Sequence, residues 1–301
     1  MKKIAVLMGG MSSERAVSLV SGTNVAEALA SLGKYEVVPV DLKEEGLSTL
    51  PGGVDAVYVA LHGGWGENGG VQAALNARKI PYTGPGVAAS QVAMDKVMTK
   101  KALESANVPT APWALAARDA SRSPLPLPVV VKPPCDGSSV GISKVADEAS
   151  WPAARDAAFA CVPDKGPDAR VLVEAFVPGR EFTVAVVDGE AWPVVEIVAK
   201  GGWYGYDEKY RSGETRYPFL EDAALSARLK ELAVRAFRAI GCRGVTRVDF
   251  RVAPGGSCYV LELNTSPGLT SHSLVPKAGM KTGLTFAQVC DRILASADYD
   301  R

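Results

Sequence analysis

The most informative part of the sequence reads Leu261-Glu-Leu-Asn-Thr-Ser-Pro-Gly-Leu-Thr-Ser-His-Ser-Leu274. It begins inside an apolar run over 257–263 that predicts a β-strand, and a second such run lies just before it, over 244–252. The turn sequence Ala253-Pro-Gly-Gly256 separates the two runs, so we expect an antiparallel hairpin. The quoted residues would then form the end of its second strand and the loop that follows it.

Acidic and amide side chains stand at alternating positions on this hairpin. Alternate residues along a strand share a face, so Glu262 points with Asn264, and Asp249 points with Arg247. Pairing of the strands can therefore bring Asp249, Glu262 and Asn264 together. Two carboxylates and an amide oxygen suit Mg²⁺ held jointly with phosphate oxygens. A solvent-facing polar stripe would give the same letters, although the intervening residues are apolar.

The turn over 264–274 is rich in small hydroxylated residues. After a strand, such residues offer backbone N–H groups and hydroxyls to a carboxylate or an oxyanion. Ser- and Gly-rich composition is also ordinary in any loop.

A second candidate segment is Lys132-Pro-Pro-Cys-Asp-Gly-Ser-Ser-Val-Gly141, which follows the apolar run Val129–Val131. A lysine that closes a strand, followed by a Gly/Ser loop, suits phosphate binding, because it combines a cation with backbone N–H groups. The segment is not a Walker A motif, since the order G-x-x-x-x-G-K-[ST] is absent. A flexible surface loop is the alternative.

The segment 171–181 suggests a slot for adenine. An extended hinge there would offer backbone groups to the base, and a carboxylate, Glu174 or Glu181, would lie within reach of ribose hydroxyls. From the residues alone, a buried strand with two edge acids is the preferred interpretation.

The first 88 residues predict an open parallel sheet. Apolar runs at 4–8, 36–40 and 56–61 alternate with helical patterns. The first run ends in Gly9-Gly10 and the third is followed by His62-Gly63-Gly64, at the sheet edge where such folds bind ligands. His62 follows the third run, and Glu14 is expected beside it. A G-x-G-x-x-G fingerprint is missing, which argues against a nucleotide-dependent oxidoreductase.

The remaining sequence predicts two further domains. We expect one helix over 90–106, then a small α+β unit with strands at 129–132 and 170–174 and a helix near 148–160. Strands at 181–187 and 191–197, a Gly- and Tyr-rich loop over 200–218 and an amphipathic helix over 223–240 come next. The predicted domain limits are 1–88, 89–177 and 178–301.

Composition excludes several classes of protein. The 33 basic and 33 acidic residues cancel and form no basic stripe, so nucleic acid is not an expected partner. Neither a signal peptide nor a run of about 18 apolar residues is present, so no membrane association is expected. Five scattered cysteines without a C-x-x-C pair, and only two histidines, indicate a reducing cytosol rather than a disulfide or zinc framework.

These segments, in this order, resemble the D-alanine–D-alanine ligase family of ATP-grasp enzymes over nearly the whole chain. The most specific stretches are Ser12–Arg15, Leu61–Gly63, Met94–Lys96, Gly137–Gly141, Asp207–Tyr210 and Leu261–Leu274. The resemblance implies an ATP-grasp fold, with an N-terminal open parallel α/β domain, a small central domain and a C-terminal mixed-sheet domain.

The resemblance also implies how ATP and metal are bound. The groups around the phosphates would be Lys96, Lys132, Ser139 and Lys209. Adenosine would be held by Glu174, Phe176, Val177 and Glu181. Two Mg²⁺ ions, with Mn²⁺ as a substitute, would be held by Asp249, Glu262 and Asn264, and Glu262 would bridge them.

Substrate contacts are implied in the same way. Glu14 would hold the ammonium of the first D-alanine, with His62 nearby, and would join Ser138 and Tyr210 in a hydrogen-bonded triad. The carboxylate of the second D-alanine would be bound by Ser273 and the backbone of Leu274. The oxyanion hole would consist of Arg247 and the amide of Gly268. Relatives that make D-alanyl-D-lactate depart from the tyrosine that stands here as Tyr210.

The implied activity is ATP-dependent formation of D-alanyl-D-alanine through a D-alanyl phosphate, for peptidoglycan synthesis, by a cytoplasmic homodimer. The loop over 200–218 would be a lid. Two departures are a short connector before Val129 and the thiol of Cys135 in the phosphate loop. Alternatives are another acceptor, D-lactate or D-serine, and a non-catalytic ATP-binding relative, which the intact lysines and acids argue against.

Overall fold

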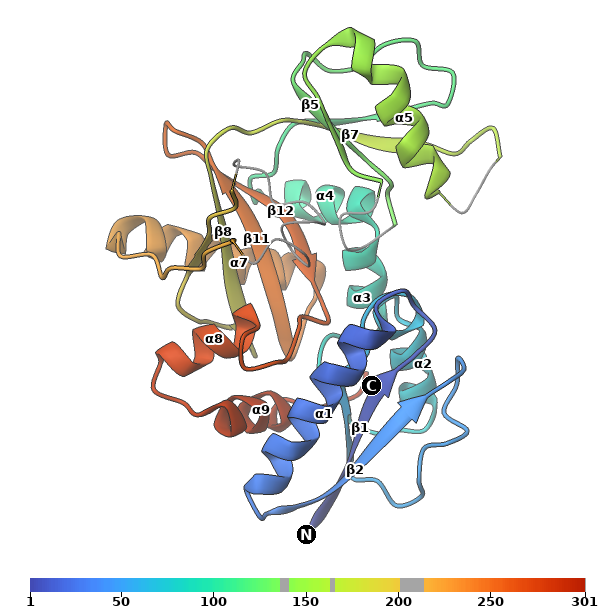
Figure 1. Cartoon of the computed structure of the whole chain (residues 1–301), viewed down its shortest axis with the longest axis vertical. Helices are drawn as coiled ribbons and strands as arrows, with labels where there is room; N and C mark the ends of the chain where they lie inside the picture. Colours follow the sequence, from blue (N-terminus) through green and yellow to red (C-terminus); the bar gives the residue numbers. More distant parts are fainter. Residues whose placement is uncertain (136–140, 163–165, 201–213, 301) are drawn as a thin grey trace.

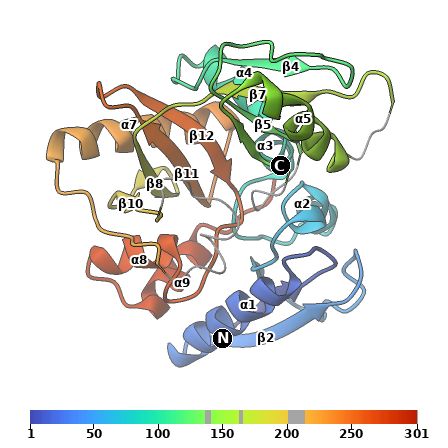
Figure 2. The same ribbon diagram turned by 45° about the horizontal axis from the view of Figure 1, so that its top comes forward.

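The computed structural model describes residues 1–135, 141–162, 166–200 and 214–300. Within them the strands form three sheets, which follow one another along the chain (Figure 1). Figure 2 shows the same three parts from a second direction, with the N-terminal and central parts at opposite ends.

The N-terminal sheet is parallel, in the order β2 (Tyr35–Leu42), β1 (Lys2–Gly9), β3 (Ala56–Val59). Buried side chains alternate between its faces, as expected of a strand covered on both sides. Ile4 and Val6 pack with α1 (Arg15–Ser31) and α9 (Phe286–Ala295). Ala5 and Leu7 pack with α2 (Gly70–Ala77). The short 3-10 helix η1 (Gly64–Gly66) follows β3.

The central sheet is antiparallel, in the order β4-β7-β5-β6. Its strands are β4 (Trp113–Ala116), β5 (Val129–Lys132), β6 (Ser143–Val145) and β7 (Val171–Ala175). One face is covered by α5 (Trp151–Ala160), which the 3-10 helix η2 (Glu148–Ser150) precedes, and which buries Trp151 and Phe159 against the sheet.

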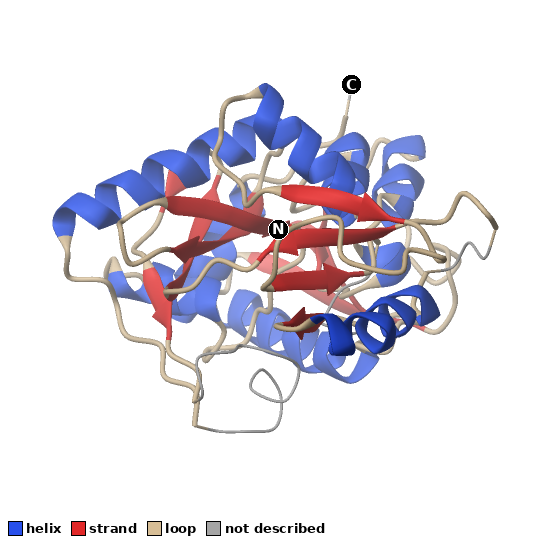
Figure 3. Ribbon diagram, turned by 90° about the horizontal axis from the view of Figure 1, so that it is seen from above, coloured by secondary structure: helices blue, strands red, loops and turns tan. Residues whose placement is uncertain are grey.

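The C-terminal sheet is antiparallel as well and runs β10-β8-β11-β12, with β9 beside β8. Its strands are β8 (Arg180–Val187), β9 (Glu190–Ala191), β10 (Val195–Ile197), β11 (Val245–Val252) and β12 (Cys258–Asn264). The helices around it are α3 (Val87–Met94), α4 (Lys96–Ser105), α7 (Ala223–Ile240) and α8 (Leu274–Lys281). Figure 3 shows helices on the outer sides of the strands.

The prediction of one helix over 90–106 is wrong. The chain breaks at Asp95, whose backbone is extended and whose side chain accepts hydrogen bonds from the N–H groups of Val97 and Met98. An aspartate that caps a new helix ends the old one, because its backbone leaves the helical region. The apolar residues of both helices pack in the cluster of the C-terminal sheet.

The strand predicted over 191–197 is interrupted as well. β9 ends at Ala191 and β10 begins at Val195, with Pro193 between them. Proline has no N–H group for a sheet. The predicted fold class is otherwise confirmed: a parallel N-terminal sheet precedes two antiparallel sheets. In the described part of the chain, no helix has both the length and the apolar character needed to cross a membrane.

Candidate active site

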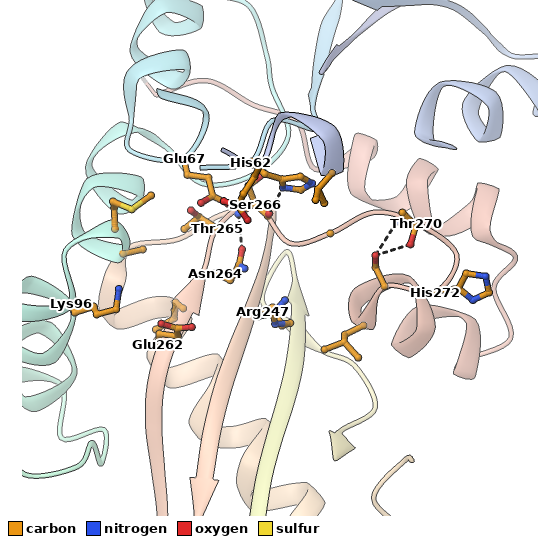
Figure 4. A pocket seen from close by; sticks show the side chains of 18 of the residues that line it. His62, Glu67, Lys96, Arg247, Glu262, Asn264, Thr265, Ser266, Thr270 and His272 are labelled. Carbon is orange, nitrogen blue, oxygen red and sulfur yellow. Dashed lines mark hydrogen bonds between the residues drawn. The ribbon is translucent and has the colours of Figure 1, made fainter. Parts of the chain in front are cut away.

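A cavity of about 320 Å³ lies where the loops after β1 and β3 meet the ends of β11 and β12 (Figure 4). Segments far apart in the sequence contribute its walls. The lining residues are Glu14, Val17, His62, Glu67, Ala93, Met94, Lys96, Tyr217, Arg247, Glu262, Leu263, Asn264, Thr265, Ser266, Gly268, Thr270, His272, Ser273 and Leu274.

The antiparallel register of β11 and β12 groups the polar side chains of the hairpin. Asp249 lies opposite Glu262, and Arg247 lies opposite Asn264. Directly opposed residues project to the same face of a sheet. Four polar side chains therefore share one face, and Arg247, Glu262 and Asn264 line the cavity.

Asp249 is buried and is held from two sides. Its Oδ1 accepts hydrogen bonds from the Thr183 hydroxyl, at 2.6 Å, and from Arg247 Nε, at 2.9 Å. Its Oδ2 accepts from Arg247 Nη2 at 2.8 Å. The carboxylate is thus fixed on β11 before any ligand binds.

The oxygen donors of this face fit a magnesium site shared with phosphate. Asp249 and Glu262 supply carboxylates, and Asn264 supplies an amide oxygen, which accepts a hydrogen bond from Ser266 N at 3.1 Å. Such a set leaves room for phosphate oxygens, as Mg²⁺ sites in ATP-using enzymes do. No group of three or more His, Cys, Asp or Glu side chains that would hold a metal unaided occurs among the described residues.

Lys96 and Lys132 come from different elements that meet where β5 leads into the predicted phosphate-binding loop. The N–H of Lys96 donates to the carbonyl of Pro134 at 2.8 Å. Lys132 ends β5, is 8% exposed and forms an ion pair with Glu174. Burial lowers the pKa of Lys132, but the nearby carboxylates of Glu174, Glu262 and Glu181 together outweigh it, and the net pKa is raised. Lys132 is therefore a permanent cation.

Glu174 does not lie at an exposed hinge. Its side chain is buried in β7, 2% exposed, between Lys132 and Lys100. Burial raises the pKa of this carboxyl, yet the two lysines overcome that effect and leave it lowered.

The other residues predicted to hold adenosine surround Arg251. The guanidinium donates to the carbonyl of Val177 and to Glu181 Oε2, each at 3.2 Å. The ring of Phe176 lies 3.8 Å from Lys144 Nζ, and its N–H donates to the carbonyl of Pro128 at 3.0 Å. The N–H of Phe176 and the carbonyl of Val177 thus both have hydrogen-bond partners within the protein.

His62 is a near neighbour of Glu14, as predicted, and is 5% exposed. Its Nδ1 lies 2.9 Å from the carbonyl of Ser266, which can only accept, so Nδ1 carries the proton. Its Nε2 lies 2.9 Å from the hydroxyl of Ser21. The ring therefore joins α1 to the loop after β12.

Glu67, at the end of η1, was not singled out from the sequence and lines the cavity. Burial and the nearby charge of Glu14 raise the pKa of its carboxyl to about 8. A carboxyl in a glycine-rich loop after a parallel strand was the signal that could have found it.

The loop after β12 brings three predicted groups together. The hydroxyl of Ser273 accepts from Thr270 N at 3.1 Å, and a Cβ on Gly268 would lie 2.9 Å from that hydroxyl. Ser273 is the N-cap of α8 and Leu274 is its first residue. The N-terminus of a helix favours a carboxylate.

Four predicted residues lie outside the described part of the chain, as does most of the predicted lid. They are Ser138, Ser139, Lys209 and Tyr210. Cys135, just before the first gap, is exposed.

Two family models match the chain. The model described as the C-terminus of D-ala D-ala ligase matches residues 92–295, and the one described as its N-terminus matches residues 3–50. The chain belongs to the D-alanine–D-alanine ligase family. This confirms the family expected from the sequence motifs.

Relatives support this membership along the full length. The chain is 46% identical to the D-alanine–D-alanine ligase of Syntrophotalea carbinolica, covering 98% of this chain and 96% of that one. It is 45% identical to the ligase of Anaeromyxobacter dehalogenans, covering 98% and 97%.

Solved structures of D-alanine–D-alanine ligases share the fold. The ligase of Bacillus anthracis in complex with ATP superposes with a TM-score of 0.84 at 29% identity, covering 98% of this chain and 97% of that one. The D-Ala:D-Ser ligase VanG of Enterococcus faecalis gives a TM-score of 0.83 at 29% identity, covering 98% of each chain. The family fold thus accommodates more than one acceptor.

Proposed function

We propose that the cavity between the N-terminal loops and the β11–β12 hairpin is where this ATP-dependent ligase joins two D-alanine molecules. The carrying observation is that Asp249 and Glu262, opposed on neighbouring strands, lie beside Arg247 and the N-terminus of α8. The carboxylates that would hold metal ions at the phosphates of ATP thus lie next to Arg247, which can stabilise an oxyanion, and to the N-terminus of α8, which can bind a carboxylate. The family's activity requires this combination.

The first D-alanine binds with its ammonium group at Glu14. Its carboxylate oxygen attacks the γ-phosphorus of ATP, the bond to the β,γ-bridging oxygen breaks, and ADP leaves. Lys96, Lys132 and Lys209 surround the phosphates, and the site works by positioning and charge stabilisation, without a protein nucleophile. The product of this step is D-alanyl phosphate.

The second D-alanine places its carboxylate at Ser273 and the first N–H of α8, at Leu274. Its amine attacks the acyl carbon, loses a proton, and inorganic phosphate leaves from the tetrahedral intermediate. Arg247 and the N–H of Gly268 stabilise the oxyanion, as preorganised donors in a partly dehydrated site do.

Asp249, Glu262 and Asn264 would hold two Mg²⁺ ions, with Mn²⁺ as a substitute. When bound, these ions would neutralise phosphate charge as the γ-phosphoryl group is transferred. The oxygen donors on the shared face of β11 and β12 support this assignment.

Further parts of the proposal rest on the family. Phe176, Val177 and Glu181 hold adenosine, and Ser139 lies at the phosphates. Glu174, which the family resemblance also assigns to adenosine, is instead buried between Lys100 and Lys132. Tyr210 and Ser138 complete the triad with Glu14 beneath the lid over 200–218. The enzyme acts in the cytoplasm as a homodimer and supplies peptidoglycan synthesis.

The test is phosphate release from ATP and Mg²⁺ with D-alanine, L-alanine, or D-alanine plus D-lactate or D-serine. We expect release with D-alanine alone and D-alanyl-D-alanine as the product by mass. Preferential formation of D-alanyl-D-lactate or D-alanyl-D-serine over D-alanyl-D-alanine would show that the second substrate is not D-alanine. ATP binding without any release with D-alanine would overturn the substrate assignment.

A further inference from the structure

A buried lysine that lines no part of the cavity lies next to the phosphate site. Lys100, on α4, is 1% exposed. Its Nζ donates to the Thr110 hydroxyl at 2.6 Å and to the carbonyl of Ala111 at 3.3 Å, and it forms an ion pair with Glu174. Burial of a lysine is costly unless the charge is paired, so this arrangement has a specific structural or functional reason.

Glu174 is shared between two cations. Its Oε1 pairs with Lys100 and its Oε2 pairs with Lys132. Charges interact more strongly inside a protein than in water, so a lone Glu174 would offset the charge of Lys132. With Lys100 present, the row of three side chains carries one net positive charge, and Lys132 is the member nearer to the phosphate loop.

Lys100 also connects β5 and β7 to β12, the strand that carries Glu262 and Asn264. The hydroxyl of Thr110, which Lys100 contacts, donates to the carbonyl of Val260 at 2.9 Å. The N–H of Val260 donates to the carbonyl of Pro109 at 2.9 Å. Val260 is two residues before Glu262 on β12. A continuous set of contacts therefore runs from Lys132 to the neighbourhood of Glu262.

We propose that Lys100 is a positioning residue for ATP, which offsets the charge of Glu174 and thereby leaves the charge of Lys132 available to the phosphates. Lys100 acts through Glu174 and does not touch the nucleotide. The inference rests on the proposed role of Lys132 as a phosphate ligand. It differs from a purely structural ion pair because it predicts an effect confined to the phosphate half of ATP.

The test compares Lys100→Met with Lys101→Met, an exposed lysine on the same helix. Binding of ATP and of adenosine is measured by calorimetry, with the KM values for ATP and D-alanine. We expect Lys100→Met to weaken ATP binding about tenfold with adenosine binding and the KM for D-alanine unchanged. Lys101→Met should match the wild type. Equal losses for ATP and adenosine, or no loss for ATP, would overturn the inference.

A second variant tests the charge argument directly. In Lys100→Met/Glu174→Gln, the carboxylate that pairs with Lys132 is gone, so the ratio of ATP affinity to adenosine affinity should return toward the wild-type ratio. A ratio as low as in Lys100→Met would contradict the argument. If Lys100→Met does not fold, Lys100→Gln replaces it with the same expectation.

Lys132→Met separates this inference from the assignment on which it rests. If Lys132→Met retains ATP affinity, the phosphate role of Lys132 fails, and the role of Lys100 fails with it. If Lys132→Met loses ATP affinity while Lys100→Met retains it, the phosphate site stands and only the inference on Lys100 is wrong.

Discussion

Asp249 on β11 lies directly opposite Glu262 on β12, at the last regular pair before a β-bulge. Beyond this pair the register shifts, and Phe250 pairs with Val260 rather than with Leu261. A bulge reorients the side chains next to it and is frequent beside active sites. Here it brings Val260 opposite Phe250, and both side chains are buried in the apolar cluster of the C-terminal sheet.

Glu262→Gln tests the metal assignment. The amide keeps the shape of the side chain but removes the charge, so we expect turnover to fall by at least about 10²-fold with an unchanged Tm. Phosphate release and thermal unfolding are the measurements. Glu231→Gln, on the exposed side of α7, is the control and should behave as the wild type. Substantial activity in Glu262→Gln would remove Glu262 from the metal site.

Arg247→Lys tests the oxyanion role. Lysine keeps the charge but loses the planar fork that donates twice to Asp249. We expect kcat to fall about 10²-fold, which corresponds to about 3 kcal/mol. Thr183→Val removes another donor to Asp249 and leaves Arg247 in place. If Thr183→Val lowers kcat as much as Arg247→Lys, Arg247 acts only by holding Asp249.

Gly268→Ala tests the acceptor side of the cavity. The new Cβ would lie 2.9 Å from the Ser273 hydroxyl, closer than such contacts allow, while the N–H of residue 268 is retained. We expect kcat/KM for the second D-alanine to fall by about 10-fold to 100-fold, with ATP binding unchanged. Gly255→Ala, at a turn with no atom within 4 Å of the new Cβ, is the control. Unchanged kinetics would place the acceptor elsewhere.

The sequence predicted the hairpin and its polar face because two rules were sufficient. Side chains alternate along a strand, and a Pro-Gly-Gly turn joins adjacent strands. A different rule predicted helix α7 at its observed limits, Ala223–Ile240: its apolar residues recur with the helical period.

The break at Asp95 and the role of Lys100 were not predictable by these rules. Residues 90–106 have one continuous helical pattern, and only the backbone conformation of Asp95 divides it. A lysine in an amphipathic helix normally faces solvent, so nothing local marks Lys100 as buried. Its partners, Glu174 and Thr110, are distant along the chain or belong to another element. Tertiary contacts decide such positions.

His62 gives the stability of the protein a pH dependence. Burial lowers the pKa of the imidazole, against the opposing charge of Glu14. Because the folded-state pKa lies below that of the unfolded chain, the unfolded chain takes up the proton first as the pH falls. The contribution of His62 to stability is therefore complete above the ordinary histidine pKa of about 6.5 and is lost as the pH falls below it.

We expect His62→Gln to be less stable than the wild type near neutral pH. When the pH is lowered from about 7.5 to about 5.5, the Tm of His62→Gln should decrease by less than the Tm of the wild type. His272→Gln, which alters an exposed histidine, should follow the wild type. The carboxyl of Glu67, with its pKa raised to about 8, responds in the opposite sense over this range. It is present in all three proteins, so the difference between them isolates His62. Equal losses of Tm in His62→Gln and the wild type would show that the ring carries the same charge in the folded and unfolded chain.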